Sequence, residues 1–165
     1  MPQTEPPRRS SRTLLIVIIA LLLLILCGGA VPVVGILAAI AIPNFIQMQL
    51  RAKRAELPAN VAGIRVAELA YEATFDTFLA VRDPVPLDPL MLGDRTVDWP
   101  SGTAFDELGW APDGNVRGTY WVEVSADGQD FTVHGLCDLD GDGEPAEFTA
   151  SKSSKATMET WDSVY

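Results

Sequence analysis

The sequence predicts an α+β protein, in which a long N-terminal membrane-spanning helix packs by its C-terminal half on a small antiparallel β-sheet. An apolar run extends from Leu14 to Phe45 and exceeds the roughly 20 residues that cross a bilayer. Apolar residues then recur at helical spacing as far as Phe78. After Gly118 the pattern changes to short alternating strands separated by turn residues. A helix followed by an antiparallel meander is the order of an α+β domain.

We expect five segments along the 165 residues, with the membrane anchor first and the sheet last. They are a disordered cytoplasmic tail (1–12), a transmembrane helix (13–43), an amphipathic helix (44–82), an irregular connection (83–118) and an antiparallel sheet (119–165).

The formal charge of −10 is unevenly placed. Before Leu14 three arginines face one glutamate, whereas after Pro43 nine basic residues face twenty-one acidic ones, which gives −12. Arginines before the apolar run favour a cytoplasmic N-terminus and an extracytoplasmic acidic head. An acidic head without a basic groove also argues against nucleic acid as a partner.

Two interpretations of the apolar run remain open. Leu14–Cys27 suits the core of a signal peptide cleaved near Gly28–Ala30. Alternatively the whole run is one anchor, loosened at Gly28, Gly29 and Pro32. We favour the anchor, because the apolar character continues past any cleavage point, and expect Met1–Ala30 to stay attached.

The end of this run carries small residues and one proline. Gly35, Ala38 and Ala39 would let another helix approach closely in a lipid setting, where packing joins helices. Pro43 removes one backbone N–H donor and bends a helix. A membrane helix tolerates this bend better when neighbouring helices can bond the carbonyl that lost its donor. We therefore predict that Gly35, Ala38, Ala39 and Pro43 pack against other helices.

Beyond Pro43 the spacing predicts an amphipathic helix packed on the sheet, with a break at Pro58. Its apolar face comprises Leu57, Val61, Ile64, Tyr71, Phe75 and Phe78, while Arg65, Glu68, Glu72 and Asp76 fall largely elsewhere. The following residues, 83–118, are dense in proline and glycine, and only a short helical turn is expected there, at Phe105–Leu108.

Strands are expected where apolar and polar residues alternate. Asp127–Gly128 supplies a hairpin turn between the first two. The strands are Thr119–Val124, Phe131–Cys137, Glu147–Ala150 and, on weaker alternation, Thr157–Trp161.

An acidic loop, DLDGDGE, follows the second strand. Asp138, Asp140 and Asp142 can converge on one hard cation, with Glu144 beside them, and calcium is the natural candidate outside the cytoplasm. Thr149 stands where an EF-hand has its bidentate glutamate, and a solvated acidic turn explains the same residues.

Catalytic signatures are lacking in the sequence. His134 is the single histidine and lies mid-strand, where a structural role is the commoner one. Cys137 suits a small buried apolar position, and a disulfide with Cys27 is not expected. The four tryptophans are expected to pack in the core or under loops. We expect a structural protein and not an enzyme.

Three stretches resemble bacterial type IV pilins and type II secretion pseudopilins. They are GILAAIAIPNF (35–45), LGWAPDGNVRGTYWVEV (108–124) and DLDGDG (138–143). The resemblance implies a subunit or accessory component of a type IV pilus or type II secretion system, which assembles with copies of itself or other pilin-like subunits. Some pseudopilins hold a structural calcium in a nearby sheet loop.

The chain departs from that family near its start. Aligned on Gly35–Pro43, the family's glutamate is replaced by Leu26, and no Gly-Phe leader junction occurs near Leu22. The alternative is therefore a non-assembling binding or sensory module with a pilin-like head. Both hypotheses place a single-pass protein in the bacterial cytoplasmic membrane, and the first also allows a cell-surface fibre.

Overall fold

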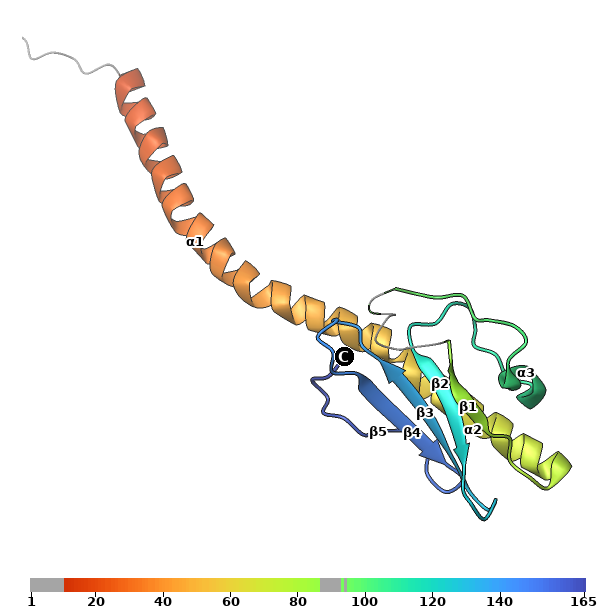
Figure 1. The fold of residues 1–165 in the computed structure, drawn as a ribbon. Helices are drawn as coiled ribbons and strands as arrows, with labels where there is room; N and C mark the ends of the chain where they lie inside the picture. The colour runs from red at the N-terminus through yellow and green to blue at the C-terminus, as the bar shows by residue number, and fades with distance from the viewer. Residues whose placement is uncertain (1–10, 87–92, 94) are drawn as a thin grey trace, which may run out of the picture. The chain divides into compact units, whose positions relative to one another are not determined.

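A computed structural model describes residues 11–86, 93 and 95–165 of the chain. The chain divides into two compact units, Met1–Ile46 and Gln47–Tyr165. A long apolar helix precedes an antiparallel sheet, which confirms the predicted α+β class (Figure 1). The elements are α1 (Ser11–Arg54), α2 (Glu56–Phe75), β1 (Val81–Val85), α3 (Ala104–Leu108), β2 (Thr119–Val124), β3 (Phe131–Cys137), β4 (Ala146–Ser151) and β5 (Thr157–Met158).

Helix α1 contains the whole apolar run, and nearly all of its large apolar side chains are exposed. Within the described residues, the continuous helical stretch that begins with α1 is the one long and apolar enough to cross a membrane. The helix passes through Gly28, Gly29 and Pro32 without interruption, so the loosening expected there does not break it. A proline inside a helix removes one hydrogen bond and bends the axis, but the turns on either side can persist.

The helical stretch is interrupted at Ala55, three residues before the break expected at Pro58. Pro58 has no N–H to donate to the carbonyl of Arg54, four residues earlier. It therefore lies in the first turn of α2, where backbone N–H groups have no partner within the helix in any case. The break in the helix near Pro58 is confirmed, but it lies at Ala55 and not at the proline itself.

Helix α2 ends at Phe75, so the helix expected over 44–82 is too long. Asp76 adopts the left-handed conformation (φ 54°) and its N–H donates to the carbonyl of Glu72 at 2.8 Å. Such a cap stops a helix. Strand β1 begins five residues later and includes Pro84. A proline is tolerated there because β1 lies at the edge of the sheet.

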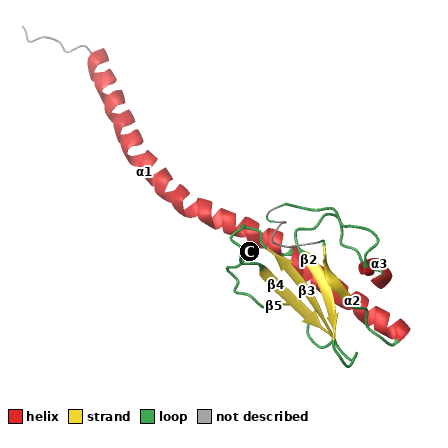
Figure 2. Cartoon of the chain, in the orientation of Figure 1, coloured by secondary structure: helices red, strands yellow, loops and turns green. Residues whose placement is uncertain are grey.

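The five strands form one antiparallel sheet in the order β1-β2-β3-β4-β5 (Figure 2). Strands β2, β3 and β4 coincide with the predicted ones to within one residue. The predicted turn joins β2 to β3, with Gly128 at φ +70° and its N–H donating to the Ser125 carbonyl. The fourth expected strand is shorter than predicted, Thr157–Met158, and β1 was not predicted.

The core lies between α2 and one face of the sheet. Alternate residues of β3 are buried, and α2 contributes Leu57, Val61 and Ile64. A Cβ atom added at Gly135 would lie 2.6 Å from Val61 Cγ2, so the glycine lets the helix come close to the strand. The buried apolar set also includes Phe78, Val81, Phe105, Val116, Tyr120, Val122, Phe131, Val133, Cys137, Phe148 and Ala150.

The connection expected to be irregular over 83–118 holds more structure than predicted. It includes the end of β1, the predicted helical turn as α3, and a bridge between Val97 and Val116. Residues 87–92 and 94 of this connection lie outside the described residues. The rings of Trp99, Phe105 and Trp110 pack together, with centroids 5.4–5.5 Å apart. This cluster covers the side of α2 at Gly63, where an added Cβ would meet Trp110 Nε1 at 2.8 Å.

Candidate assembly surface and loop sites

The residues predicted to pack against other helices lie on α1. Gly35, Ala39 and Pro43 are exposed and Ala38 is half-buried. A Cβ atom added at Gly35 would meet nothing within 4 Å. Packing of these four residues against another helix stays a prediction.

A second helical surface was not predicted. Seven residues on the side of the helix away from the sheet are small or apolar, and six of them are alanine. At 3.6 residues per turn they form one stripe running from the end of α1 along α2. We call this surface the alanine stripe: Ala52, Ala55, Ala59, Ala62, Val66, Ala70 and Ala73. All are exposed except the half-buried Ala62, and Val66 is 61% exposed.

Charged side chains of α2 are engaged elsewhere. In a solvated surface helix they would occupy the outward face. Here each of the four is buried or paired with the sheet and its loops. Glu56 accepts a hydrogen bond from the Arg117 N–H (2.7 Å), Arg65 donates to the carbonyls of Ser151 (2.6 Å) and Lys152 (2.8 Å), Glu72 pairs with Lys152 (2.7 Å), and Glu68 is fully buried.

The end of α1 is tied to the C-terminal segment. Arg54 is 7% exposed and donates to the backbone carbonyls of Asp162 (3.0 Å) and Val164. Its guanidinium also lies 5.0 Å from the ring centre of Tyr165, and the Tyr165 carbonyl accepts the Leu139 N–H at 2.8 Å. Arg54 is therefore a structural residue of the head.

The acidic loop brings together three of its four predicted ligands. Asp138, Asp140 and Asp142 each offer a carboxylate oxygen, and these oxygens lie within 4.8 Å of one another. Asp138 is 3% exposed, and its two oxygens accept the N–H groups of Gly141 (2.8 Å) and Gly143 (3.0 Å). Glu144 is exposed and is not among the three carboxylates that the described structure groups together.

This loop can hold a hard cation, but its geometry also suits a plain acidic turn. Desolvation and then the neighbouring charge of Asp142 raise the pKa of Asp140 above its ordinary value. A cation between the carboxylates would offset that repulsion. The hydrogen bonds to Asp138 already shape the loop without one, so calcium remains a prediction for these residues.

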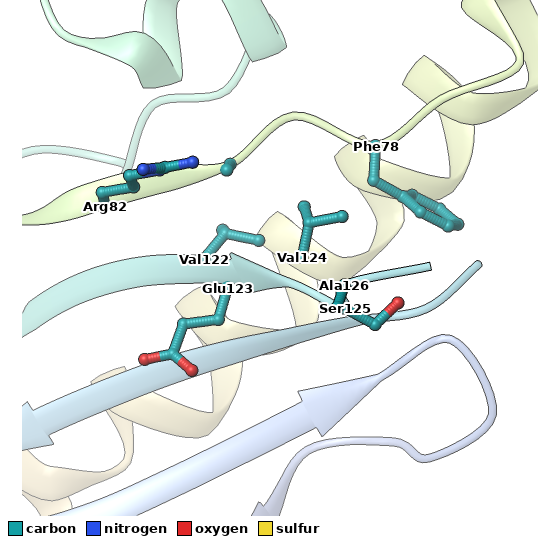
Figure 3. A pocket seen from close by; sticks show the side chains of 8 residues that line it. Phe78, Arg82, Val122, Glu123, Val124, Ser125 and Ala126 are labelled. Atoms are coloured by element: carbon teal, nitrogen blue, oxygen red, sulfur yellow. The ribbon is translucent and has the colours of Figure 1, made fainter. Parts of the chain in front are cut away.

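A cavity of about 640 Å³ lies between the α2–β1 connection and the end of β2 (Figure 3). Its apolar wall is formed by Phe78, Ala80, Val122 and Val124. Arg82 and Glu123 stand at the opposite end from Phe78. The lining offers one guanidinium, one carboxylate and the Ser125 hydroxyl. That hydroxyl donates to Asp127 Oδ1 at 2.7 Å within the turn after β2, so its partner belongs to the turn and not to the cavity lining.

His134 takes part in a stack on the sheet face turned away from α2. Its ring lies parallel to that of Trp121, with centroids 4.6 Å apart, and its Nδ1 atom is 3.1 Å from Glu147 Oε1. Cys137 is fully buried, and desolvation raises the pKa of its thiol to about 12. In the described part of the chain these two residues do not form a catalytic pair. Trp161, expected to be packed, is 85% exposed.

Comparison with known proteins gives one informative match. Over 109 residues the chain is 32% identical to the type IV major pilin protein PilA of Myxococcus xanthus (strain DK1622). The aligned part is 66% of this chain but only 38% of that pilin's length. No protein-family model matches the chain, and no solved structure matches it significantly. Over the aligned residues, and in its long apolar helix followed by an antiparallel sheet, this chain resembles a type IV pilin.

Proposed function

We propose that this chain is a structural subunit of a type IV pilus, held in the bacterial cytoplasmic membrane by α1 before it assembles with other pilin-like subunits. The alanine stripe is the observation that carries the proposal. The similarity to a pilin gives the class of assembly. The stripe lies on the part of the helix that belongs to the head. Packing against other subunits would explain why this exposed surface is made of alanine.

A helix that faces water on its outer side normally places charged residues there. On α2 the outer face is alanine with one exposed valine, and the charges are engaged by the sheet. Alanine side chains allow two helices to approach closely. Such a face is favourable in a bundle of helices and contributes little to the stability of a solitary head.

Two finer alternatives compete with this proposal. A pseudopilin of a type II secretion system would use the same surfaces in a shorter assembly. A non-assembling binding or sensory module would keep the fold and remain dispersed in the membrane, and Leu26 in place of the family's glutamate favours this alternative. Assembly into multimers distinguishes the pilus subunit and the pseudopilin from the non-assembling module. The length of the filament then distinguishes the pilus subunit from the pseudopilin.

The test introduces charge into the stripe. Ala59→Glu and Val66→Glu should abolish filaments sheared from cells that make the protein, and abolish crosslinked multimers in their membranes. Ala126→Glu, at an exposed alanine in the turn after β2, is the matched control and should leave both unchanged. Normal multimers in both stripe variants, with the chain present at normal levels, would refute the role of the stripe. An absence of multimers in the unmodified chain would favour the non-assembling alternative.

Topology is the second part of the proposal. The positive residues before the run and the charge of −12 after Pro43 favour an extracytoplasmic head. A phosphatase that is active only outside the cytoplasm, fused after Tyr165, should therefore be active. Activity only from a cytoplasmic reporter at the same position would reverse the orientation.

A further inference from the structure

Glu68 is a carboxylic acid buried in the core of the head. It lies one turn after Ile64 on the apolar face of α2, and its side chain is 0% exposed. The prediction that Glu68 falls largely off this face is wrong. Its Oε2 atom accepts the Leu79 N–H at 3.1 Å, whereas Oε1 is buried without a hydrogen-bond partner in the described structure. A buried carboxylate held by one donor is costly when ionised and much less costly when protonated.

Among the residues that the structure describes, the elements around Glu68 do not offer a compensating charge. The faces of β1, β3 and β4 turned toward the helix are apolar, apart from the Cys137 thiol. From α3, Glu107 accepts a hydrogen bond from Tyr71 at 3.4 Å, so the charge on that side is negative. On α2 itself Glu72 is already paired with Lys152, whose ammonium lies 5.1 Å from the ring centre of Phe78.

We propose that Glu68 is a proton-dependent latch, which holds the connection between α2 and β1 on the helix when neutral and releases it when ionised. Leu79, the residue it binds, lies midway between Asp76, where the helix is capped, and Val81, where β1 begins. An ionised side chain gains by reaching water, and it can do so only if this connection moves away from α2.

The latch acts on one wall of the cavity. Phe78 and Ala80, the two neighbours of Leu79, line it, as does Arg82 in β1 (Figure 3). β1 is an edge strand, so one side of it lacks a neighbouring strand in the described part of the chain, and its register with β2 is irregular between Val81 and Val85. Opening would therefore begin at this edge and enlarge the cavity, while the pairing of β2, β3 and β4 stays intact.

The direction of the pH effect follows from burial. Desolvation raises the pKa of Glu68 from 4.5 to about 7, partly opposed by the hydrogen bond from Leu79. A group with a raised pKa stabilises the closed form below its ordinary pKa, and this contribution is lost as pH rises toward the folded-state value. From pH 5 to pH 7 the open fraction of the connection should rise on the order of thirtyfold, if opening exposes the carboxyl fully.

Hydrogen–deuterium exchange of the full chain in detergent micelles tests this prediction. After correction for the chemical exchange rate, protection of the peptide spanning Phe78–Arg82 should fall from pH 5 to pH 7, while that of β3 should not. Glu68→Gln keeps an oxygen for the Leu79 N–H but cannot ionise, so its protection should not vary with pH. Glu72→Gln, which removes a partly exposed carboxylate from the same helix, is the matched control and should retain the fall in protection.

The same fall in Glu68→Gln as in the unmodified chain would overturn the proposal, as would a flat profile in the unmodified chain. Infrared spectroscopy of the unmodified chain keeps the test independent of how the variant folds. The absorption of a protonated carboxylic acid should be present at pH 6 and absent at pH 8.5. A spectrum without that band at pH 6 would also refute the latch.

Discussion

Arg54 and Asp162 form an ion pair between the end of α1 and the C-terminal segment, 108 positions apart, with Nη2 and Oδ1 separated by 2.6 Å. The two partners differ in burial, because the Arg54 side chain is 8% exposed and that of Asp162 is 73% exposed. The guanidinium makes further contacts with backbone carbonyls and with the Tyr165 ring. The guanidinium should therefore contribute more to the stability of the folded head than its ion pair with Asp162 does alone.

Arg54→Met should lower the free energy of unfolding of the head by about 2–3 kcal/mol, because the backbone carbonyls of Asp162 and Val164 lose a charged donor that is itself buried. Asp162→Asn should cost less than Arg54→Met, since the Asp162 carboxylate is largely exposed and the guanidinium keeps its backbone carbonyls and the Tyr165 ring. Chemical unfolding of the full chain in detergent, followed by tryptophan fluorescence, measures both changes. Equal losses in the two variants would contradict the structural role of the guanidinium.

Gly135→Ala should destabilise the head by about 1–3 kcal/mol, because the new methyl group would lie 2.6 Å from Val61 Cγ2 and force the helix from the strand. Gly35→Ala is the control, since a Cβ at that position meets nothing within 4 Å. The same unfolding measurement should show no change in the head for this second variant. If Gly135→Ala unfolds like the unmodified chain, the close approach is not a requirement of the fold.

Calcium should raise the melting temperature of the full chain in detergent if the acidic loop binds it. Binding to the folded head alone stabilises it by about 2.7 kcal/mol at a hundredfold excess over the dissociation constant. Asp140→Asn combined with Asp142→Asn should abolish this shift, whereas Glu144→Gln should reduce it little, because Glu144 lies outside the group of three carboxylates. Identical melting curves of the unmodified chain in calcium and in chelator would leave the loop as an acidic turn.

Much of the sheet could be predicted because its residues alternate clearly. In β3 every second side chain is buried, and in β2 the buried Tyr120 and Val122 flank the half-buried Trp121. The Asp127–Gly128 turn between the two strands fixes their register. The same alternation located β4 to within one residue. The long helix was equally clear, since the run from Leu14 to Phe45 is longer than the roughly 20 apolar residues that cross a bilayer.

The remaining features depend on tertiary context. Pro84 and Pro86 are turn residues by local preference, and only the edge position of β1 makes Pro84 compatible with a strand. Glu68 has the helical spacing of a core residue, but a carboxylic acid is normally found at the surface. The prediction followed the residue type and therefore placed Glu68 outside the core. The alanine stripe was missed because alanine is neither polar enough nor large enough to mark a face.

Burial of Cys137 has a practical consequence for labelling. The chain has two cysteines, and the one at position 27 is exposed on α1 while Cys137 is inaccessible and has a raised pKa. Because the thiolate is the reacting species, a maleimide probe added to the folded head would not label Cys137, and labelling at this position would begin only when the head opens. Labelling of Cys137 would therefore report unfolding of the head without an engineered cysteine.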